Sequence, residues 1–126
     1  MATAPTPAAP RRFTFPQVAI ALQTLALAFQ AVTAGILLSP SHTAYVLHDA
    51  GSKVMYGASM LYVIAAVLAW RPGGGPARPV LYASGFLVLA SVQVVVGVAR
   101  VPGVHVPLGI LMFTLSVLAL VRRRRS

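Results

Sequence analysis

Two histidines, His48 and His105, each stand near the start of a long apolar segment of this chain. A neutral imidazole is a good ligand for haem iron, and facing helices of a bundle are places where haem is commonly held. An ionisable side chain inside a membrane segment is costly, and it indicates a functional site when a partner can be named for it. Each histidine is the candidate partner of the other, so the pair predicts two axial ligands for one haem iron.

Four further polar side chains belong to this hypothesis. Lys53 and Arg100 are the cations near the two histidines that are available to haem propionates, and Tyr56 continues the helical face of the first histidine. Gln93 lies within an apolar span, where an amide by default bonds a neighbouring helix or the backbone, with a place beside a cofactor as the alternative. The candidate haem-binding residues are therefore His48, His105, Lys53, Arg100, Gln93 and Tyr56.

A second interpretation of the same residues needs no cofactor. A histidine within one turn of the membrane interface can keep its ring wetted among the headgroups, and Asp49 with Lys53 is an ordinary i, i+4 ion pair. Both interpretations of His48 and His105 stay open on the sequence. His42 follows "SPS" and is expected in a loop, with replacement of His48 as the ligand as the alternative.

The composition indicates which elements must position these residues. Of the 126 residues, 58% are hydrophobic and 9% charged, which is far more apolar than a soluble domain. No stretch alternates like a membrane-barrel strand, whereas a helix of about 20 residues satisfies its own backbone hydrogen bonds across the bilayer. We therefore predict an all-α integral membrane protein, an up-down-up-down four-helix bundle with its second and fourth helices on a diagonal. The helices are expected at residues 15–38, 45–70, 79–99 and 104–121.

The flanking segments and two prolines support these boundaries. Residues 1–14 include an Ala/Pro/Thr-rich stretch and are expected to form a disordered cytoplasmic tail, and residues 122–126 a basic cytoplasmic C-terminus. Pro16 and Pro107 are expected in the first turns of the first and fourth helices, where a missing N–H does no harm.

The charge distribution predicts an orientation. Eight of the ten Lys and Arg residues flank the predicted helices on the side of the two termini. Since this bias in short loops sets orientation, both termini are predicted to be cytoplasmic in a multi-pass protein of the plasma membrane. Anionic lipid headgroups then account for the net charge of +9, so the expected partner is the lipid bilayer and not nucleic acid. The absence of cysteine excludes disulfides, thiolate metal sites and cysteine nucleophiles.

The chain also contains a short internal repeat. Gln30 and His42 recur as Gln93 and His105, 63 residues further along. With a short gap, "HDAG", which begins at His48, aligns instead with "HVPLG". Membrane proteins are often built from duplicated segments. The pattern predicts two helical hairpins, each consisting of a glutamine, a small residue, an outer loop, a histidine and a helix.

These segments resemble a known family. The connection between the third and fourth helices of haem A synthases is similar to "VQVVVGVARVPGVHVPLGILMF" (92–113), and their histidine-headed second helix to "LHDAGSKVMYGASMLYVIAAVLA" (47–69). Haem A synthases have two four-helix halves, and in each half histidines on the second and fourth helices ligate a haem near the outer face. The chain is similar to one half, over residues 15–121. The resemblance implies that His48 and His105 are axial ligands of a b-type haem.

The chain departs from that family in ways that bear on catalysis. The family's catalytic half has an acidic residue shortly before the histidine of its second helix and an arginine just after it, and many members have a cysteine pair in the first outer loop. Here Val46 and Leu47 precede the histidine, Asp49 follows it, and there is no cysteine. Oxidation of a porphyrin methyl group is therefore not expected of this chain alone, no catalytic residue is assigned, and whether the chain is an enzyme stays open.

Two functions follow from these observations. The first is a small haem A synthase-like membrane protein that binds haem b between its second and fourth helices near the outer face, for haem handling or electron transfer, alone, as a homodimer or in a larger membrane complex. The alternative is a cofactor-free structural or accessory subunit of a larger membrane complex. A transporter is disfavoured because the single acidic residue, Asp49, lies near the predicted surface beside Lys53.

Overall fold

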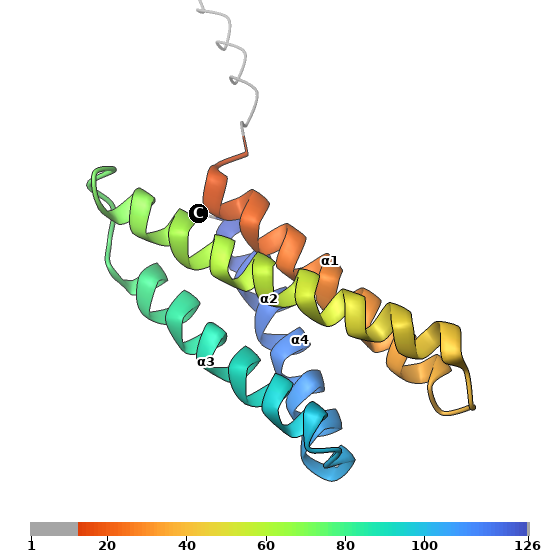
Figure 1. Cartoon of the computed structure of the whole chain (residues 1–126). Helices are drawn as coiled ribbons and strands as arrows, with labels where there is room; N and C mark the ends of the chain where they lie inside the picture. The colour runs from red at the N-terminus through yellow and green to blue at the C-terminus, as the bar shows by residue number, and fades with distance from the viewer. Residues whose placement is uncertain (1–12, 126) are drawn as a thin grey trace, which may run out of the picture.

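The computed structural model describes residues 13–125, and these form four helices joined by short connections (Figure 1). Each helix is long and apolar enough to cross a membrane, and the described residues contain no strand. The predicted all-α multi-pass membrane architecture is thus confirmed. Most of the predicted N-terminal tail lies outside the described residues. The helices are α1 (Phe15–Ile36), α2 (His42–Trp70), α3 (Arg78–Val98) and α4 (Pro102–Arg125).

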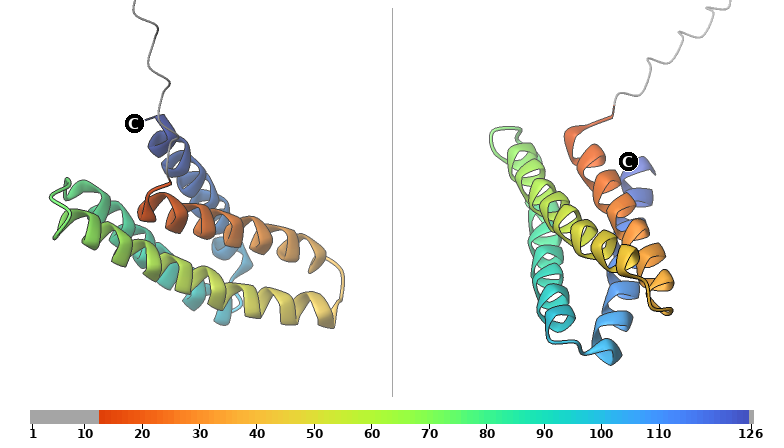
Figure 2. Two further views of the ribbon diagram at one scale, coloured as in Figure 1. Left: turned by 90° about the horizontal axis from the view of Figure 1, so that it is seen from above. Right: turned by 45° about the vertical axis from the view of Figure 1, so that its right-hand side comes forward.

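The four helices form a ring in chain order. Contacts join α1 to α2, α2 to α3, α3 to α4 and α4 back to α1, whereas no Cα atoms of α2 and α4 approach within 8 Å. The predicted diagonal placement of α2 and α4 is therefore confirmed. The α1–α2 and α3–α4 hairpins diverge toward their own connections, which form two separate tips in Figure 1. The start of α1, the α2–α3 connection and the end of α4 lie at the opposite end (Figures 1 and 2).

Helix α2 begins earlier than the sequence analysis placed it, at His42 instead of residue 45. The Ser41 hydroxyl accepts a hydrogen bond from the main-chain N–H of Ala44 at 3.2 Å, which caps the helix. His42 is consequently the first helical residue and is exposed, not part of a loop. His48 accordingly lies nearly two turns into α2.

Helix α4 also differs from its predicted bounds at both ends. It begins at Pro102, whose fixed φ suits a first turn, so Pro107 lies inside the helix and not in its first turn. Pro107 has no N–H to donate to the carbonyl of Gly103, four residues earlier. The arginines expected to form a separate tail continue the helix to Arg125, because arginine is a good helix former and cations are favoured at a helix C-terminus.

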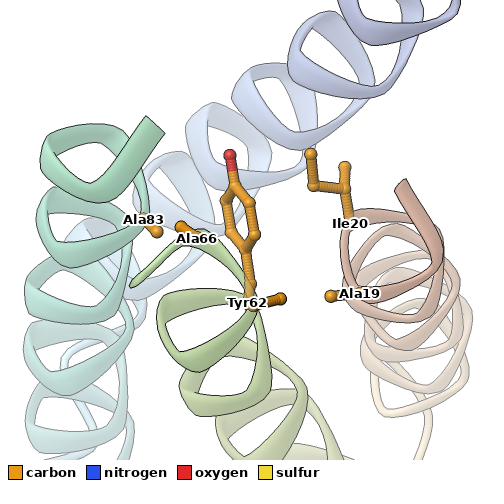
Figure 3. Packing of buried hydrophobic residues seen from close by; sticks show 6 residues of the cluster. Ala19, Ile20, Tyr62, Ala66 and Ala83 are labelled. Carbon is orange, nitrogen blue, oxygen red and sulfur yellow. The ribbon is translucent and has the colours of Figure 1, made fainter. Parts of the chain in front are cut away.

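The core is narrow and the outer surface is apolar, as expected for a bundle whose helices face lipid. One buried cluster consists mainly of alanines around Ile20 and Tyr62, and Figure 3 shows the Tyr62 ring standing between α1 and α3. A second cluster contains Leu27, Met55 and Met112 and lies closer to the two histidines along the chain. Many large apolar side chains point outward, for example Leu25 and Val98 at 67% and 80% exposure.

Some buried positions recur between the two hairpins. Three of the six buried residues of α1 have a buried counterpart on α3 63 residues later, and two of the seven buried residues of α2 have one on α4 57 residues later, the spacing that also relates the two histidines. The buried pairs are Ile20 with Ala83, Gln23 with Phe86, Leu27 with Ala90, Met55 with Met112, and Ser59 with Ser116.

Polar side chains join the two hairpins in the middle of the bundle. The amide of Gln23 donates to the Ser116 hydroxyl at 3.0 Å, and the Thr24 hydroxyl lies 2.8 Å from the same oxygen. On the other side, the hydroxyls of Tyr56 and Ser91 are 3.0 Å apart. These bonds tie α1 to α4 and α2 to α3 inside an apolar medium.

Candidate functional site

The structure brings His48 of α2 and His105 of α4 together. Their ring centroids are 6.2 Å apart and their planes make an angle of 68°. The backbones of these diagonal helices do not approach within 8 Å, so the two imidazoles span the space between them. Both rings are partly buried. The juxtaposition predicted from their places near the starts of two apolar segments is thus present in the fold.

Gln93 of α3 holds His105 by both its main chain and its side chain. The His105 ring nitrogen Nδ1 lies 3.1 Å from the main-chain carbonyl oxygen of Gln93, and the Gln93 amide donates to the main-chain carbonyl of His105 at 2.9 Å. Because a carbonyl only accepts, Nδ1 must carry the proton in this contact. The neutral His105 ring therefore has its lone pair on Nε2.

Thr33 of α1 holds His48 in the same tautomer. The hydroxyl oxygen of Thr33 lies 2.9 Å from His48 Nδ1, and its proton is directed to the main-chain carbonyls of Phe29 and Gln30, both at 3.1 Å. With its only proton used in this way, the hydroxyl accepts from His48 Nδ1–H. The lone pair of the neutral His48 ring is therefore on Nε2 as well.

The two hairpins hold their histidines by the same arrangement. Gln30 donates its amide to the main-chain carbonyl of His48 at 3.0 Å, just as Gln93 does to His105. In both hairpins the Nδ1 proton is directed back to the helix before. The difference is the Thr33 hydroxyl, which stands between His48 and the Gln30 carbonyl, whereas His105 reaches the Gln93 carbonyl directly.

Three glycines let the helices approach closely enough for these bonds. A Cβ atom at Gly51 would collide with the Gln30 amide nitrogen and the Phe29 ring, and one at Gly109 would lie 3.0 Å from the Gln93 amide nitrogen. A Cβ at Gly97 would lie 2.9 Å from Cε1 of the His105 ring. Gly51 and Gly109 are the final residues of the aligned "HDAG" and "HVPLG" segments. In both segments the glycine makes room for a glutamine of the preceding helix.

The remaining predicted site residues lie apart from the imidazole pair or have other partners. The Lys53 ammonium forms an exposed ion pair with Asp49 at 2.7 Å, as the i, i+4 spacing predicted. Tyr56 bonds α3 and lies two turns further along α2 than His48, about 12 Å at helical rise. Arg100 is exposed just beyond α3, with a positive φ of 54°.

Sequence reasoning missed Thr33 and left the clamping role of Gln30 unspecified. Gln30 could be found because it is the counterpart of Gln93 in the repeat. Thr33 has no such signal, since Val96 stands at the equivalent position 63 residues later. Its role depends on how α1 packs against α2, which residue spacing does not determine.

Two apolar grooves on the described part of the chain lie elsewhere. The larger, about 610 Å³, runs along the lipid-facing side of α1 and α2, and the smaller, about 270 Å³, lies beside the start of α1. Neither is lined by His48 or His105.

No protein-family model, curated protein or solved structure matches the chain. The resemblance to haem A synthases consequently stays a prediction that rests on the motifs quoted above.

Proposed function

We propose that this protein is a small membrane haem protein in which His48 and His105 bind a b-type haem between α2 and α4, for haem handling or electron transfer. The observation that carries the proposal is the way both Nδ1 atoms are hydrogen-bonded, together with the closeness of the two rings. Each Nδ1 proton is directed to an acceptor on the preceding helix, which leaves an Nε2 lone pair on two rings 6.2 Å apart. Metal-binding histidines typically donate their other ring N–H in this way.

The number of metal-ligating side chains favours haem over a bare metal ion. The described residues contain no group of three or more His, Cys, Asp or Glu side chains able to hold a metal. A structural zinc site takes four protein ligands and a catalytic one three, whereas a haem iron needs only axial ligands from the protein. The rings of His48 and His105 would be the two protein ligands of such a haem, and their centroids lie 6.2 Å apart.

Each neighbouring residue would contribute in its own way to such a site. Thr33 and the Gln93 carbonyl orient the rings, and Met55 and Met112, seven residues after each histidine, shield the inner side from water. Arg100 has no partner among the described residues and is therefore the cation offered to a propionate, whereas Lys53 is already paired. The bound haem would supply one-electron chemistry.

Room for a porphyrin would come from the seam between the hairpins. The backbones of α2 and α4 make no close contact there, and the hairpins already diverge at this end (Figure 1). Parting them requires no break in either hairpin, since each histidine is held from within its own hairpin. Methyl oxidation of the haem A synthase type is not part of this proposal.

The charge distribution supports a location for the haem. Arg71, Arg78 and the arginines from Arg122 onward lie at the end where α1 starts, opposite to the histidines (Figure 1). By the positive-inside rule this end faces the cytoplasm of a plasma-membrane protein, so the haem would lie near the outer face. Assembly as a homodimer or with a larger membrane complex is compatible with the exposed apolar surface.

A reduced-minus-oxidised absorption spectrum of the detergent-purified protein supplied with haem tests the proposal. We expect a b-type α-band in the wild type and in the His42→Ala control, whose histidine is exposed and outside the pair. The band should be lost in the His48→Ala/His105→Ala double variant. An absent band in the wild type, or one that persists in the double variant, would refute haem ligation by this pair.

The groove along α1 and α2 favours the second candidate, a cofactor-free accessory subunit. Its lining includes Gly57 and Ala58, and small residues of this kind allow a partner's transmembrane helix to pack closely. An accessory subunit would co-purify with a membrane partner and would tolerate the double histidine substitution.

A further inference from the structure

The two imidazoles differ in what engages the nitrogen that would bind iron. Nε2 of His105 lies 3.4 Å from the amide nitrogen of Gln93, the same nitrogen that donates to the His105 carbonyl at 2.9 Å. A glutamine amide has two N–H groups, so one can serve each acceptor. Nε2 of His48 has no hydrogen-bond partner among the described residues. The lone pair of one ring is therefore engaged by the protein and that of the other is free.

The ring of His105 also packs directly against α3, at Gly97. A Cβ atom at Gly97 would lie 2.9 Å from His105 Cε1 and 3.1 Å from Nδ1, so the ring fits there only because the residue is glycine. Gln93 thus contacts both ring nitrogens while the glycine receives the ring against α3. His48 is held through Nδ1 alone.

The two histidines therefore differ in the hydrogen bonds that their Nε2 atoms make when they are not bound to iron. A His105 ring released from iron would return to the Gln93 amide, with both its nitrogens engaged. A released His48 ring would leave Nε2 without a partner in the protein, so it would gain less from hydrogen bonding on release than His105 would. Release of His105 is therefore the easier of the two.

We infer, on the basis of the proposed haem site, that His48 is the retained axial ligand and His105 the exchangeable one, so that the haem takes a small neutral ligand on the His105 side. In the exchange the bond between iron and His105 Nε2 breaks and a bond from iron to the incoming donor atom forms. The lone pair of His105 then accepts from Gln93. No electron or proton is transferred between protein and ligand.

Carbon monoxide binding to the dithionite-reduced protein tests this inference. His105→Ala should retain haem and bind carbon monoxide more tightly than the wild type, because no internal ligand competes. His48→Ala should lose most of its haem. Retention of haem by His48→Ala together with its loss from His105→Ala would overturn the assignment while leaving the proposed function intact, whereas a wild type without haem would contradict the proposed function itself.

Gln93→Leu with Gln30→Leu as its matched control tests the role of the amide. Both variants lose the clamp on a histidine carbonyl, but only Gln93 contacts an Nε2 atom. We expect Gln93→Leu to weaken carbon monoxide binding by roughly two- to tenfold more than Gln30→Leu does, the value of the one additional hydrogen bond to Nε2. Equal effects of the two variants would show a merely structural role and refute the inference.

A measurement on the haem-free protein gives an independent readout. In ¹⁵N NMR of histidine-labelled protein, Gln93→Leu should shift the Nε2 resonance of His105 and leave that of His48 in place. An unshifted His105 resonance would contradict engagement of its lone pair by the amide.

Discussion

At the scale of single residues, one hydroxyl group decides the chemistry of His48. The Thr33 hydroxyl donates to the main-chain carbonyls of Phe29 and Gln30, and its oxygen accepts from His48 Nδ1. The hydroxyl therefore acts as the hydrogen-bond acceptor for the ring, a role that a main-chain carbonyl has for His105. Thr33 is the side chain within hydrogen-bond distance of His48 Nδ1. The free Nε2 lone pair on α2 thus depends on a side chain of α1.

Thr33→Val keeps the shape of this side chain and removes the acceptor. We expect haem affinity to fall by about 10- to 100-fold, as is typical when the group that orients a metal-binding histidine is lost. Thr33→Ser should restore most of the affinity, since it retains the hydroxyl. Haem titration of the purified apoprotein measures the effect.

The control for this substitution is Thr24→Val. Thr24 also lies on α1 and donates to a main-chain carbonyl of its own helix, but it contacts Ser116 and no histidine. Its loss should leave haem affinity unchanged. A comparable fall in both variants would assign the effect to α1 as a whole and not to the Thr33 hydroxyl.

At the scale of the helices, the clamps need close approach between α1 and α2. Gly51 makes this possible, because an added Cβ would meet the Gln30 amide and the Phe29 ring. The Gln30 side chain is not free to move aside without losing its bond to the His48 carbonyl. The glycine therefore couples the packing of the helices to the position of the histidine.

Gly51→Ala should lower the free energy of unfolding by about 1–3 kcal/mol, the usual cost of overpacking a tight contact. Gly57→Ala, two turns further along the same groove, meets nothing within 4 Å and should raise it by up to about 1 kcal/mol through helix propensity. Denaturant titration in detergent, followed by circular dichroism, compares the two. Equal stability of the two variants would contradict the close-contact assignment.

The helices themselves were predictable from the sequence, and their ends much less so. Four apolar blocks of membrane-spanning length identified α1 to α4, but Ser41 and Pro102 start α2 and α4 earlier than hydropathy alone indicates. That earlier start places Pro107 inside a helix. The imidazole pair was predictable from depth and diagonal placement, whereas Thr33 was not, because a hydrogen bond between two helices depends on how they are rotated against each other.

At the scale of the whole molecule, two equivalent hairpins are joined with their basic residues gathered at one end. Arg71 and Arg78 flank the α2–α3 connection and the final arginines extend α4 at that end, while Lys53 and Arg100 lie toward the other. This asymmetry predicts the orientation of the whole bundle in the membrane.

Single cysteines test the orientation cleanly, since the chain has none of its own. Ser39→Cys, in the α1–α2 connection, should react with a membrane-impermeant maleimide added to intact cells. Ala77→Cys, in the α2–α3 connection, should react only after the membrane is opened. The reverse pattern would place the histidines at the cytoplasmic face.

The way each ring is held also bears on how the chain enters the membrane during synthesis. The Nδ1 proton of His48 is satisfied by Thr33 of the first hairpin, and that of His105 by Gln93 of the second. Neither imidazole needs the other hairpin to satisfy this donor. The first hairpin can therefore enter the bilayer with its histidine already held before the second exists, and the two hairpins meet later in the plane of the lipid, each carrying its half of the site.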